Sequence, residues 1–515
     1  MEALSGCNNR TLMTSDLGSN KLSGNLPDSL GQFKFDGMIL EGIGQLTELN
    51  ALRLYGNSWN GVITENNFKN LTRLNYLSFS CTSNLLVNVR QDWIPPFSIY
   101  TMAISDCHLG PAFPSWLRTQ EEISELALSN AEISDTIPDW LWGLSPWRWW
   151  LDLSGNQLRG ELPKSIHVNQ TGALIDLGFN RLEGPIPINF GQELPILRSL
   201  ALSQNHLTGS IPPSINKIRD LSFLDLSNNH LTGEIPSQWQ RLEQLTVVDL
   251  SNNRLSDGFP SSLCSLPFLG GLKLSGNNLS GDLSIALQNC ANIYALDLDN
   301  AKNLLQHAQL VNSNNLLGEV STSLHNCSGL FLLDLGENRF LGTIPSAENV
   351  FYLSFLRLRV NVLTGKIPEE LCQFPNLYIL DLARNNLSGS IPRCIGNLIK
   401  FKYKATLSDG TLSTTQIPSP DHMELVLKGR EYEYTNIIPL VDLIDLSSNN
   451  FTGEIPEEIR KLSFQGTLNL SLKQLTGKIT DNIGSLQQLE TRDFSRPSIS
   501  NHDSFAFFES FERVI

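Results

Sequence analysis

The stretch LDLSNNHLTGEIP, residues 224–236, decides how the rest of the chain is interpreted. Closely similar stretches occur at 151–163 (LDLSGNQLRGELP), 380–392 (LDLARNNLSGSIP) and 444–456 (IDLSSNNFTGEIP). When the chain is aligned on the recurring Asn, about eighteen units follow one another, mostly at steps of 23 to 25 residues. A fixed period in this range predicts a solenoid of stacked repeats.

The spacing within one unit indicates what each residue does. Leu224 and Leu226 lie two residues apart, as on a short strand, and Leu231 follows Asn229. The Asn amide can bond to backbone groups of the turn, including those of the next coil. One unit cannot bury its own apolar face, but stacked units can. We therefore expect an α/β-type solenoid, a right-handed superhelix with short parallel strands on its concave face and few helices.

The pattern is interrupted in one long segment. Between Asn385 and Asn449 the step is one coil plus about 40 residues, and a loop of this length is usually functional or disordered. We expect four parts: repeats over 1–394 with irregular stretches near 21–56 and 278–313, an insertion over 395–441, repeats over 442–497 that degenerate after 470, and an unpatterned tail over 498–515.

Composition excludes several classes of function. The formal net charge of −15 argues against nucleic acid and against an anionic membrane surface. The chain has no Gly-rich phosphate loop, no GxSxG and no HExxH motif, and its cysteine spacing is not that of a zinc site. We expect neither an enzyme nor a cofactor or metal.

The two features that bear on location disagree. MEALSGCNNRTL has no apolar leader segment, and no run of 18 or more apolar residues occurs. Eight Asn-x-Ser/Thr acceptors nevertheless favour a secreted history. These acceptors are Asn9, Asn70, Asn169, Asn278, Asn326, Asn386, Asn450 and Asn469.

The repeat LxxLxLxxNxLxGxIP closely resembles the plant extracellular class of leucine-rich repeat. The insertion ends in HMELVLKGREYEYTNIIPLVDLIDLSSNNFTGEIPEEI, residues 422–459, and an earlier segment reads SNAEISDTIPDWLW, residues 129–142. Both resemble the apple-scab-resistance and xylanase-receptor group of plant leucine-rich-repeat receptor-like proteins. The likeness covers about residues 12 to 495.

This resemblance implies an extracellular location at the plasma membrane. Such proteins recognise microbial or endogenous ligands, have no kinase of their own, and signal through partner receptor kinases. In the family a transmembrane helix follows the last repeats, so we interpret this chain as truncated at both ends. The expected function is that of a ligand-recognising ectodomain in defence or developmental signalling. The alternatives are a secreted inhibitor of microbial wall-degrading enzymes such as polygalacturonase, which is shorter and has no insertion, and a non-functional truncated product.

Outward-facing strand positions are the candidate binding residues, because side chains alternate along a strand. The residue four positions before each Asn is mostly Asp. These Asp residues form either a solvated edge of the sheet or a row that contacts a ligand. One strand should present Phe355, Arg357 and Arg359 outward, the composition of a binding hot spot, although surface ion pairs are an equal alternative. Trp150 should also point outward, either toward a ligand or against Trp149.

Three further features remain as hypotheses. In the insertion, charge alternates with aromatic residues, and this segment either contacts a ligand or partner on the inner sheet or merely seals the gap. A stack of His206 and His230 would sense acidic pH, unless it is coincidental. Cys372 and Cys394 lie one coil apart, so a disulfide can form if the protein is secreted. The insertion residues are Lys428, Arg430, Glu431, Tyr432, Glu433 and Tyr434.

Overall fold

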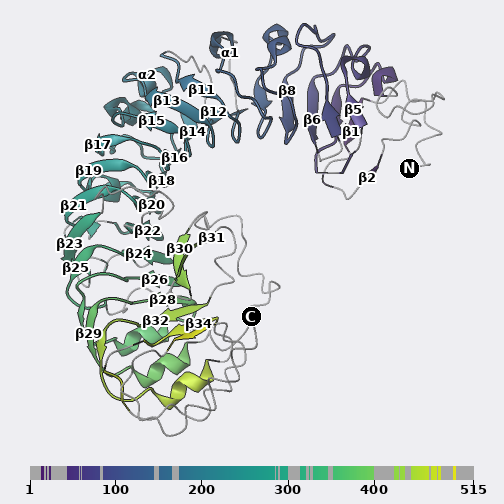
Figure 1. Ribbon diagram of the computed structural model, residues 1–515. Coiled ribbons are helices and arrows are strands. Elements are labelled where there is room, and N and C mark those ends of the chain that lie inside the picture. Colours follow the sequence, from purple (N-terminus) through teal and green to yellow (C-terminus); the bar gives the residue numbers. More distant parts are fainter. Residues whose placement is uncertain are drawn as a thin grey trace. The chain divides into compact units, whose positions relative to one another are not determined.

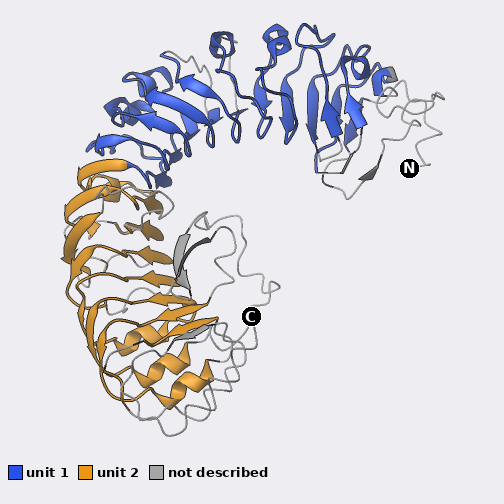
Figure 2. Ribbon diagram, in the orientation of Figure 1, with its two compact units in different colours: residues 1–253 blue, residues 254–515 orange. Residues whose placement is uncertain are grey.

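The computed structural model divides the chain into two compact units, residues 1–253 and 254–515 (Figure 2). It describes residues 13–16, 19, 23–24, 43–56, 58–59, 61–81, 85–143, 150–164, 173–284, 286–287, 290–299, 314–320, 324, 327, 329–345, 352–398, 423–427, 430–434, 442–462, 466–471, 474–476 and 491–493.

Unit 1 is built on an inner parallel sheet in which each strand pairs with the strand of the next coil. These strands line the inner side of the unit's curve (Figure 1). They are β1 (Thr14–Asp16), β3 (Ala51–Arg53), β6 (Tyr76–Ser80), β8 (Thr101–Ser105), β9 (Glu125–Ala127), β10 (Trp150–Asp152), β12 (Ala173–Asp176), β14 (Leu197–Ala201), β16 (Phe223–Asp225) and β18 (Val247–Asp249).

Unit 2 repeats this arrangement with its own inner parallel strands. β28 pairs directly with β32, so the insertion interrupts the chain but not the sheet. The strands are β20 (Gly271–Lys273), β22 (Ala295–Asp297), β24 (Leu332–Asp334), β26 (Phe355–Arg357), β28 (Ile379–Asp381), β32 (Leu443–Asp445), β34 (Thr467–Asn469) and β35 (Thr491–Asp493). Within the insertion, β30 (Met423–Leu427) and β31 (Arg430–Tyr434) form an antiparallel hairpin.

A second set of short strands follows the turn of each coil. In unit 1 these are β2 (Ser23–Gly24), β4 (Ser58–Trp59), β5 (Gly61–Ile63), β7 (Leu85–Val87), β11 (Arg159–Glu161), β13 (Arg181–Pro185), β15 (His206–Thr208) and β17 (Thr232–Glu234). In unit 2 they are β19 (Arg254–Gly258), β21 (Asn278–Asp282), β23 (Asn315–Glu319), β25 (Arg339–Leu341), β27 (Thr364–Gly365), β29 (Asn386–Gly389) and β33 (Asn450–Phe451).

Helices are few among the described residues, as the sequence predicts, and they are short. The α-helices among the described residues are α1 (Asp139–Gly143) and α2 (Phe190–Glu193). Single 3-10 turns close many of the coils, at Ile43–Gln45, Glu65–Asn67, Ser115–Thr119, Pro213–Lys217, Leu263–Ser265, Glu369–Gln373, Arg393–Asn397 and Glu457–Lys461. In the part of the chain that the structure describes, no helix has the length and apolar character needed to cross a bilayer.

The recurring Asn forms a buried ladder between coils. Asn229 donates from Nδ2 to the Leu202 carbonyl of the preceding coil at 2.9 Å and to the Leu226 carbonyl of its own coil at 3.2 Å. Its Oδ1 accepts the Leu207 N–H at 3.0 Å. The predicted role of the Asn is confirmed, but its inter-coil bonds run to the preceding coil. Because these groups have no water to bond, each Asn holds two coils together.

The bend beside each Asn needs unusual backbone angles. Asn228 adopts a φ of 53° and Gly233 a φ of 81°. Glycine takes such angles without the steric penalty that a Cβ brings, which explains the Gly four residues after the ladder Asn. The apolar frame then points inward, and Leu224, Leu226 and Leu231 are fully buried. The solenoid predicted from the period is therefore confirmed within each unit.

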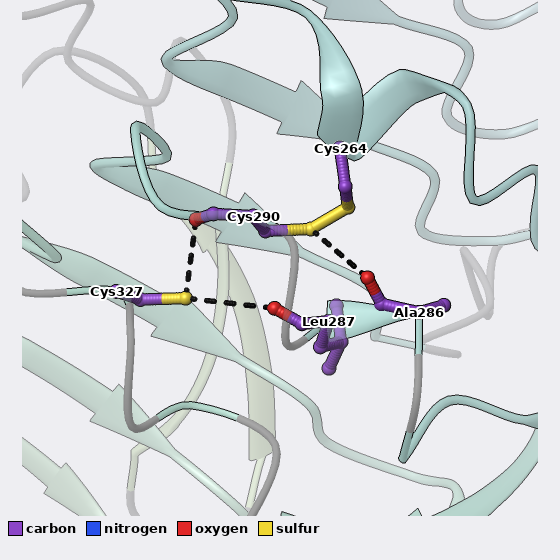
Figure 3. The surroundings of a disulfide bond; sticks show 5 residues. All are labelled: Cys264, Ala286, Leu287, Cys290 and Cys327. Atoms are coloured by element: carbon purple, nitrogen blue, oxygen red, sulfur yellow. Dashed lines mark hydrogen bonds between the residues drawn. A yellow bond between two sulfur atoms is a disulfide. The ribbon is translucent and has the colours of Figure 1, made fainter.

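Disulfides link successive coils at three places: Cys81–Cys107, Cys264–Cys290 and Cys372–Cys394. The sequence reasoning considered only the last of these. Figure 3 shows Cys327 beside the second bond, with its thiol 3.2 Å from the Cys290 carbonyl oxygen. Burial raises the pKa of Cys327 to about 11, so this thiol stays protonated and inert at neutral pH.

Candidate ligand-binding surface

An exposed apolar pair lies on the inner sheet of unit 1. Trp150 on β10 and Leu174 on β12 are direct partners in register, and 41% and 39% of their surfaces are exposed. Both stand on the sheet side opposite the buried Leu151 and Ile175. Exposed Trp is uncommon, and aromatic residues with an apolar neighbour are the usual anchors of a protein interface. The prediction that Trp150 points outward is confirmed, and its binding role stays a prediction.

A row of half-buried carboxylates runs beside this pair, formed by Asp152, Asp176, Asp225 and Asp249. Backbone N–H groups two residues on fix their orientation, as from Gly178 to Asp176 at 2.9 Å and from Ser227 to Asp225 at 2.9 Å. Burial raises the pKa of Asp176. Burial, with the charge of Asp249 adding to it, raises the pKa of Asp225 to about 6. The row is therefore acidic, and Asp225 loses its negative charge as the pH falls through about 6.

The expected hot spot in unit 2 is not accessible. Phe355 is fully buried, and Arg357 and Arg359 are each only 2% exposed. Phe355 packs in a cluster with Leu332, Ile379 and Leu443 of the neighbouring strands. Our expectation that these three side chains face solvent is wrong, because the outward side of these strands carries its own buried apolar cluster and buried ion pairs. Neither alternative holds, because these side chains form neither an exposed hot spot nor ion pairs at the surface.

Arg357 and Arg359 instead neutralise a buried group of carboxylates. Arg357 Nη1 lies against Asp299 and 3.2 Å from Asp334 Oδ2, and Arg359 Nη1 lies 3.2 Å from Asp381 Oδ2. Burial raises the pKa of Asp334 well above its ordinary value, and the charge of Arg357 opposes this shift. Removing one partner from a buried ion pair strongly destabilises the fold, because the other charge is left without compensation.

The insertion motif is described only in part. Lys428 is not described. Strand β31 pairs with β30, but only its backbone is described. It consists of Arg430, Glu431, Tyr432, Glu433 and Tyr434. Contact of this motif with a ligand or partner therefore stays a prediction, as do the limits of the insertion.

The two histidines do stack, with ring centroids 5.8 Å apart and planes 17° from parallel. His206 begins β15 and His230 precedes β17, so neither lies on the inner sheet, and pH sensing by them stays a hypothesis. In the described residues, no group of three or more His, Cys, Asp or Glu has a geometry that could hold a metal ion.

The glycosylation acceptors differ in accessibility. Asn70, Asn278, Asn386 and Asn450 are exposed, whereas Asn469 is half-buried in β34 and donates to Asp445 at 3.1 Å. Asn469 is thus the poorest acceptor among those described, and its use as one remains untested. The other predicted acceptors, Asn9, Asn169 and Asn326, lie outside the described residues.

Comparison with known proteins agrees with this geometry. A family model for the Leucine Rich Repeat matches six separate coils, so the fold and its inner surface define a leucine-rich-repeat protein. Receptor-like protein EIX2 of Solanum lycopersicum is 39% identical over 153 residues, which is 29% of this chain and 14% of that protein. Receptor-like protein 14 of Arabidopsis thaliana is 32% identical over 167 residues, 32% of this chain and 17% of that protein. These matches support the resemblance to plant leucine-rich-repeat receptor-like proteins. The matched coils are residues 149–168, 197–218, 220–242, 244–266, 376–398 and 441–462.

Solved structures resemble almost the whole chain. The crystal structure of PEPR1–AtPEP1 covers 95% of this chain and 62% of its own, with a TM-score of 0.71 at 25% identity. The leucine-rich-repeat ectodomain of the membrane receptor kinase GASSHO1/SCHENGEN3 from Arabidopsis thaliana, in complex with CASPARIAN STRIP INTEGRITY FACTOR 2, covers 94% of this chain and 58% of its own. Its TM-score is 0.58 at 26% identity. The chain spans less than a fifth of the length of the two curated relatives described above.

Proposed function

We propose that the chain is ligand-recognising ectodomain sequence of a plant cell-surface receptor-like protein that acts in defence or developmental signalling. The observation that carries the proposal is the exposed Trp150–Leu174 pair beside the acidic row on the inner sheet of unit 1. Such a surface suits a microbial protein or peptide with apolar side chains and basic groups. Signalling would then pass to partner receptor kinases, as the family resemblance implies.

The physical support comes from the contrast between the two units. In unit 1 the outward positions of β10 and β12 are exposed, whereas the corresponding Phe355 on β26 of unit 2 is fully buried. Only an exposed apolar residue gains from desolvation when a partner binds, at about 25 cal/mol per Å² of apolar area. The proposed contact surface therefore lies in unit 1, and the buried arginines of unit 2 serve stability.

A decoy assay tests this proposal. The purified full chain is added to leaf discs together with culture filtrates from a panel of microbes, and the oxidative burst is measured. If the chain sequesters a microbial ligand, it lowers the burst for at least one filtrate. A variant with Trp150→Ser and Leu174→Ser then loses this effect.

The control variant is Phe268→Ser. Phe268 is also exposed, at 59%, but it precedes β20 in unit 2 and lies outside the inner sheet of unit 1. This variant should sequester the ligand as well as the wild type does. If the wild-type chain lowers no burst, or if the double variant lowers it equally well, the proposed function is overturned.

A further inference from the structure

Three cysteines of unit 2 lie on successive coils but share a single disulfide bond. Cys264 precedes the inner strand β20, Cys290 precedes β22, and Cys327 precedes β24, and these three strands pair in that order. Cys264 and Cys290 are bonded to each other, whereas the thiol of Cys327 is free. The middle residue, Cys290, therefore has one cysteine on the coil before it and another on the coil after it.

Cys290 and Cys327 occupy the same position in their coils. The Cys290 N–H donates to the Leu287 carbonyl and the Cys327 N–H to the Leu324 carbonyl, each at 3.0 Å and each across three residues. Both cysteines are 1% exposed. Because the same turn recurs in neighbouring coils, the two side chains leave the backbone from matching places. A disulfide needs two cysteines that approach closely in this way.

Cys327 is in contact with the residue that carries the shared sulfur (Figure 3). Its thiol lies 3.2 Å from the Cys290 carbonyl oxygen and 4.0 Å from the Leu287 carbonyl oxygen. A thiol is a weak hydrogen-bond donor, so these two contacts restrain it only slightly. The structure thus places a nucleophile beside a disulfide and holds it there by weak bonds.

Burial keeps this nucleophile inactive while the coil is closed. The attacking species in disulfide exchange is the thiolate, and burial raises the pKa of Cys327 to about 11. When the turn opens to water, the pKa returns toward about 8.5, the ordinary value for a cysteine. The fraction of thiolate at neutral pH then rises about 300-fold. Exchange is therefore coupled to local opening of the turn that carries Cys327.

The exchange requires no other reactant. The Cys327 thiolate attacks Cys290 Sγ, a new bond forms between these two sulfurs, and the bond between Cys264 and Cys290 breaks. Cys264 leaves as a thiolate and takes up the proton that Cys327 lost. One disulfide and one thiol are present before and after the exchange, so nothing is oxidised or reduced overall.

Chain entropy does not strongly favour either bond. The Cys264–Cys290 bond closes a loop of 26 residues, and a Cys290–Cys327 bond closes one of 37. The entropy of loop closure changes only slowly with length, so we expect the two forms to differ by less than about tenfold from this cause. Cys264 is 6% exposed, so the exchange also changes the burial of the free thiol very little.

We propose that unit 2 carries an exchangeable cross-link, which moves from Cys264–Cys290 to Cys290–Cys327 when the turn of Cys327 opens. The move releases the coil of β20 from that of β22 and ties the coil of β22 to that of β24. Unit 2 thus has two covalent forms of one fold. The inference does not depend on the ligand-binding surface in unit 1.

The position of the bond bears on the stability of the buried ionic residues. Asp299 follows β22 and Asp334 ends β24, and both pair with the buried guanidinium of Arg357. Among the described residues, the coils of β22 and β24 are joined by non-covalent contacts. After the exchange a covalent bond joins them as well, so β24 should open less often and β20 more often.

Thiol labelling of the full chain tests the exchange. Oxidised protein is incubated at about pH 8.5, near the ordinary pKa of a thiol, in urea below the unfolding midpoint and without added thiol. After an acid quench, free thiols are alkylated with N-ethylmaleimide in guanidinium, and mass spectrometry of peptic peptides locates the label. The label should lie on Cys327 before incubation and should move to Cys264 in about a tenth of the molecules or more. All samples carry Cys7→Ser, because Cys7 lies outside the described residues.

A cysteine deletion tests whether the second bond can form. Cys264→Ser should refold oxidatively with Cys290 bonded to Cys327 and with neither of these residues labelled. Cys372→Ser is the matched control, because it also removes one half of a native disulfide. Its remaining partner, Cys394, is the last cysteine of the sequence and should stay labelled.

Label that stays on Cys327 throughout, or a rate of transfer proportional to protein concentration, would overturn the inference. A rate independent of concentration shows that the exchange takes place within one chain. For Cys264→Ser, a native-like circular dichroism spectrum with label on both Cys290 and Cys327 would also overturn it. If that variant does not fold, the labelling of the chain that keeps Cys264 decides alone.

Discussion

Arg357 and Asp334 form an ion pair that is almost entirely removed from water, with 3.2 Å between Arg357 Nη1 and Asp334 Oδ2 and side-chain exposures of 2% and 3%. The same guanidinium contacts Asp299, while Asp381 is shared with Arg359. Buried charges persist only when they are paired. These residues therefore act as one ionic unit that joins β22, β24, β26 and β28.

Replacing Arg357 by Ala should destabilise unit 2 by about 3–5 kcal/mol, because Asp299 and Asp334 are left as uncompensated buried charges. The measurement is urea unfolding followed by tryptophan fluorescence and by circular dichroism. Arg339→Ala serves as the control, since Arg339 on β25 is exposed and should cost less than about 1 kcal/mol. Equal unfolding midpoints for the two variants would contradict the structural role of Arg357.

The sequence predicts the coil well because each unit repeats a local rule. The period, the Leu positions and the ladder Asn depend on contacts with the adjacent coil, and that coil carries the same residues at the same spacing. Leu226 and Asn229 are buried for this reason. The sequence does not predict that the Asn bonds run to the preceding coil, but this direction does not change the fold.

The sequence does not predict which outward-facing residues of the sheet are covered by other parts of the protein. Alternation places Phe355 and Arg357 on the outward side of β26, yet burial there depends on packing and charge partners that lie many residues away, such as Asp299. The Cys81–Cys107 and Cys264–Cys290 bonds were missed although a signal existed, because both pairs are separated by 26 residues, about one coil.

Replacing the ladder residue Asn229 by Ala should cost about 3 kcal/mol or more. The substitution leaves the Leu207 N–H without a partner in a dry interior, which costs roughly 1–3 kcal/mol. It also removes the bonds from Asn229 to the Leu202 and Leu226 carbonyls, worth about 1 kcal/mol each, although these carbonyls keep their bonds from neighbouring ladder Asn side chains. Differential scanning calorimetry measures the loss. Asn228→Gly is the matched control, because this neighbour is less buried and its φ of 53° suits glycine. A loss for Asn228→Gly as large as that for Asn229→Ala would argue against the ladder.

Removing the Cys372–Cys394 disulfide by a double change to Ser should lower stability by about 3 kcal/mol. The bond closes a loop of 22 residues, and the expected effect comes mainly from the freedom that the unfolded chain regains. Chemical unfolding of the oxidised chain measures the difference. Cys327→Ser provides the control, because its thiol is not disulfide-bonded and the change closes or opens no loop. If both variants lose the same amount, the loss reflects packing of the sulfur atoms and not the cross-link.

Acidification from pH 7.5 to 5 should stabilise the folded chain. Burial raises the pKa of Asp225, Asp297 and Asp445 from 3.8 to about 6, with further increases from the charges of Asp249, Asp299 and Asp381 respectively. Because the folded pKa lies above the unfolded one, the folded state binds protons more tightly in this window. Stability is therefore highest below the unfolded pKa and is lost as the pH rises through about 6.

The size of this effect and its origin can be measured together. One pKa unit corresponds to about 1.4 kcal/mol, and the interval from pH 6 to 5 spans one unit below the folded pKa, so each carboxyl should contribute about 1 kcal/mol between the two pH values. The thermal unfolding midpoint of the wild type should rise on acidification, and Asp225→Asn should reduce that rise because its amide does not titrate. Asp282→Asn should leave the rise unchanged, since Asp282 is exposed and its hydrogen bonds with Ser284 lower its pKa. A midpoint that falls steadily from pH 7.5 to 5 would mean that these carboxyls are not the buried, proton-binding groups described above.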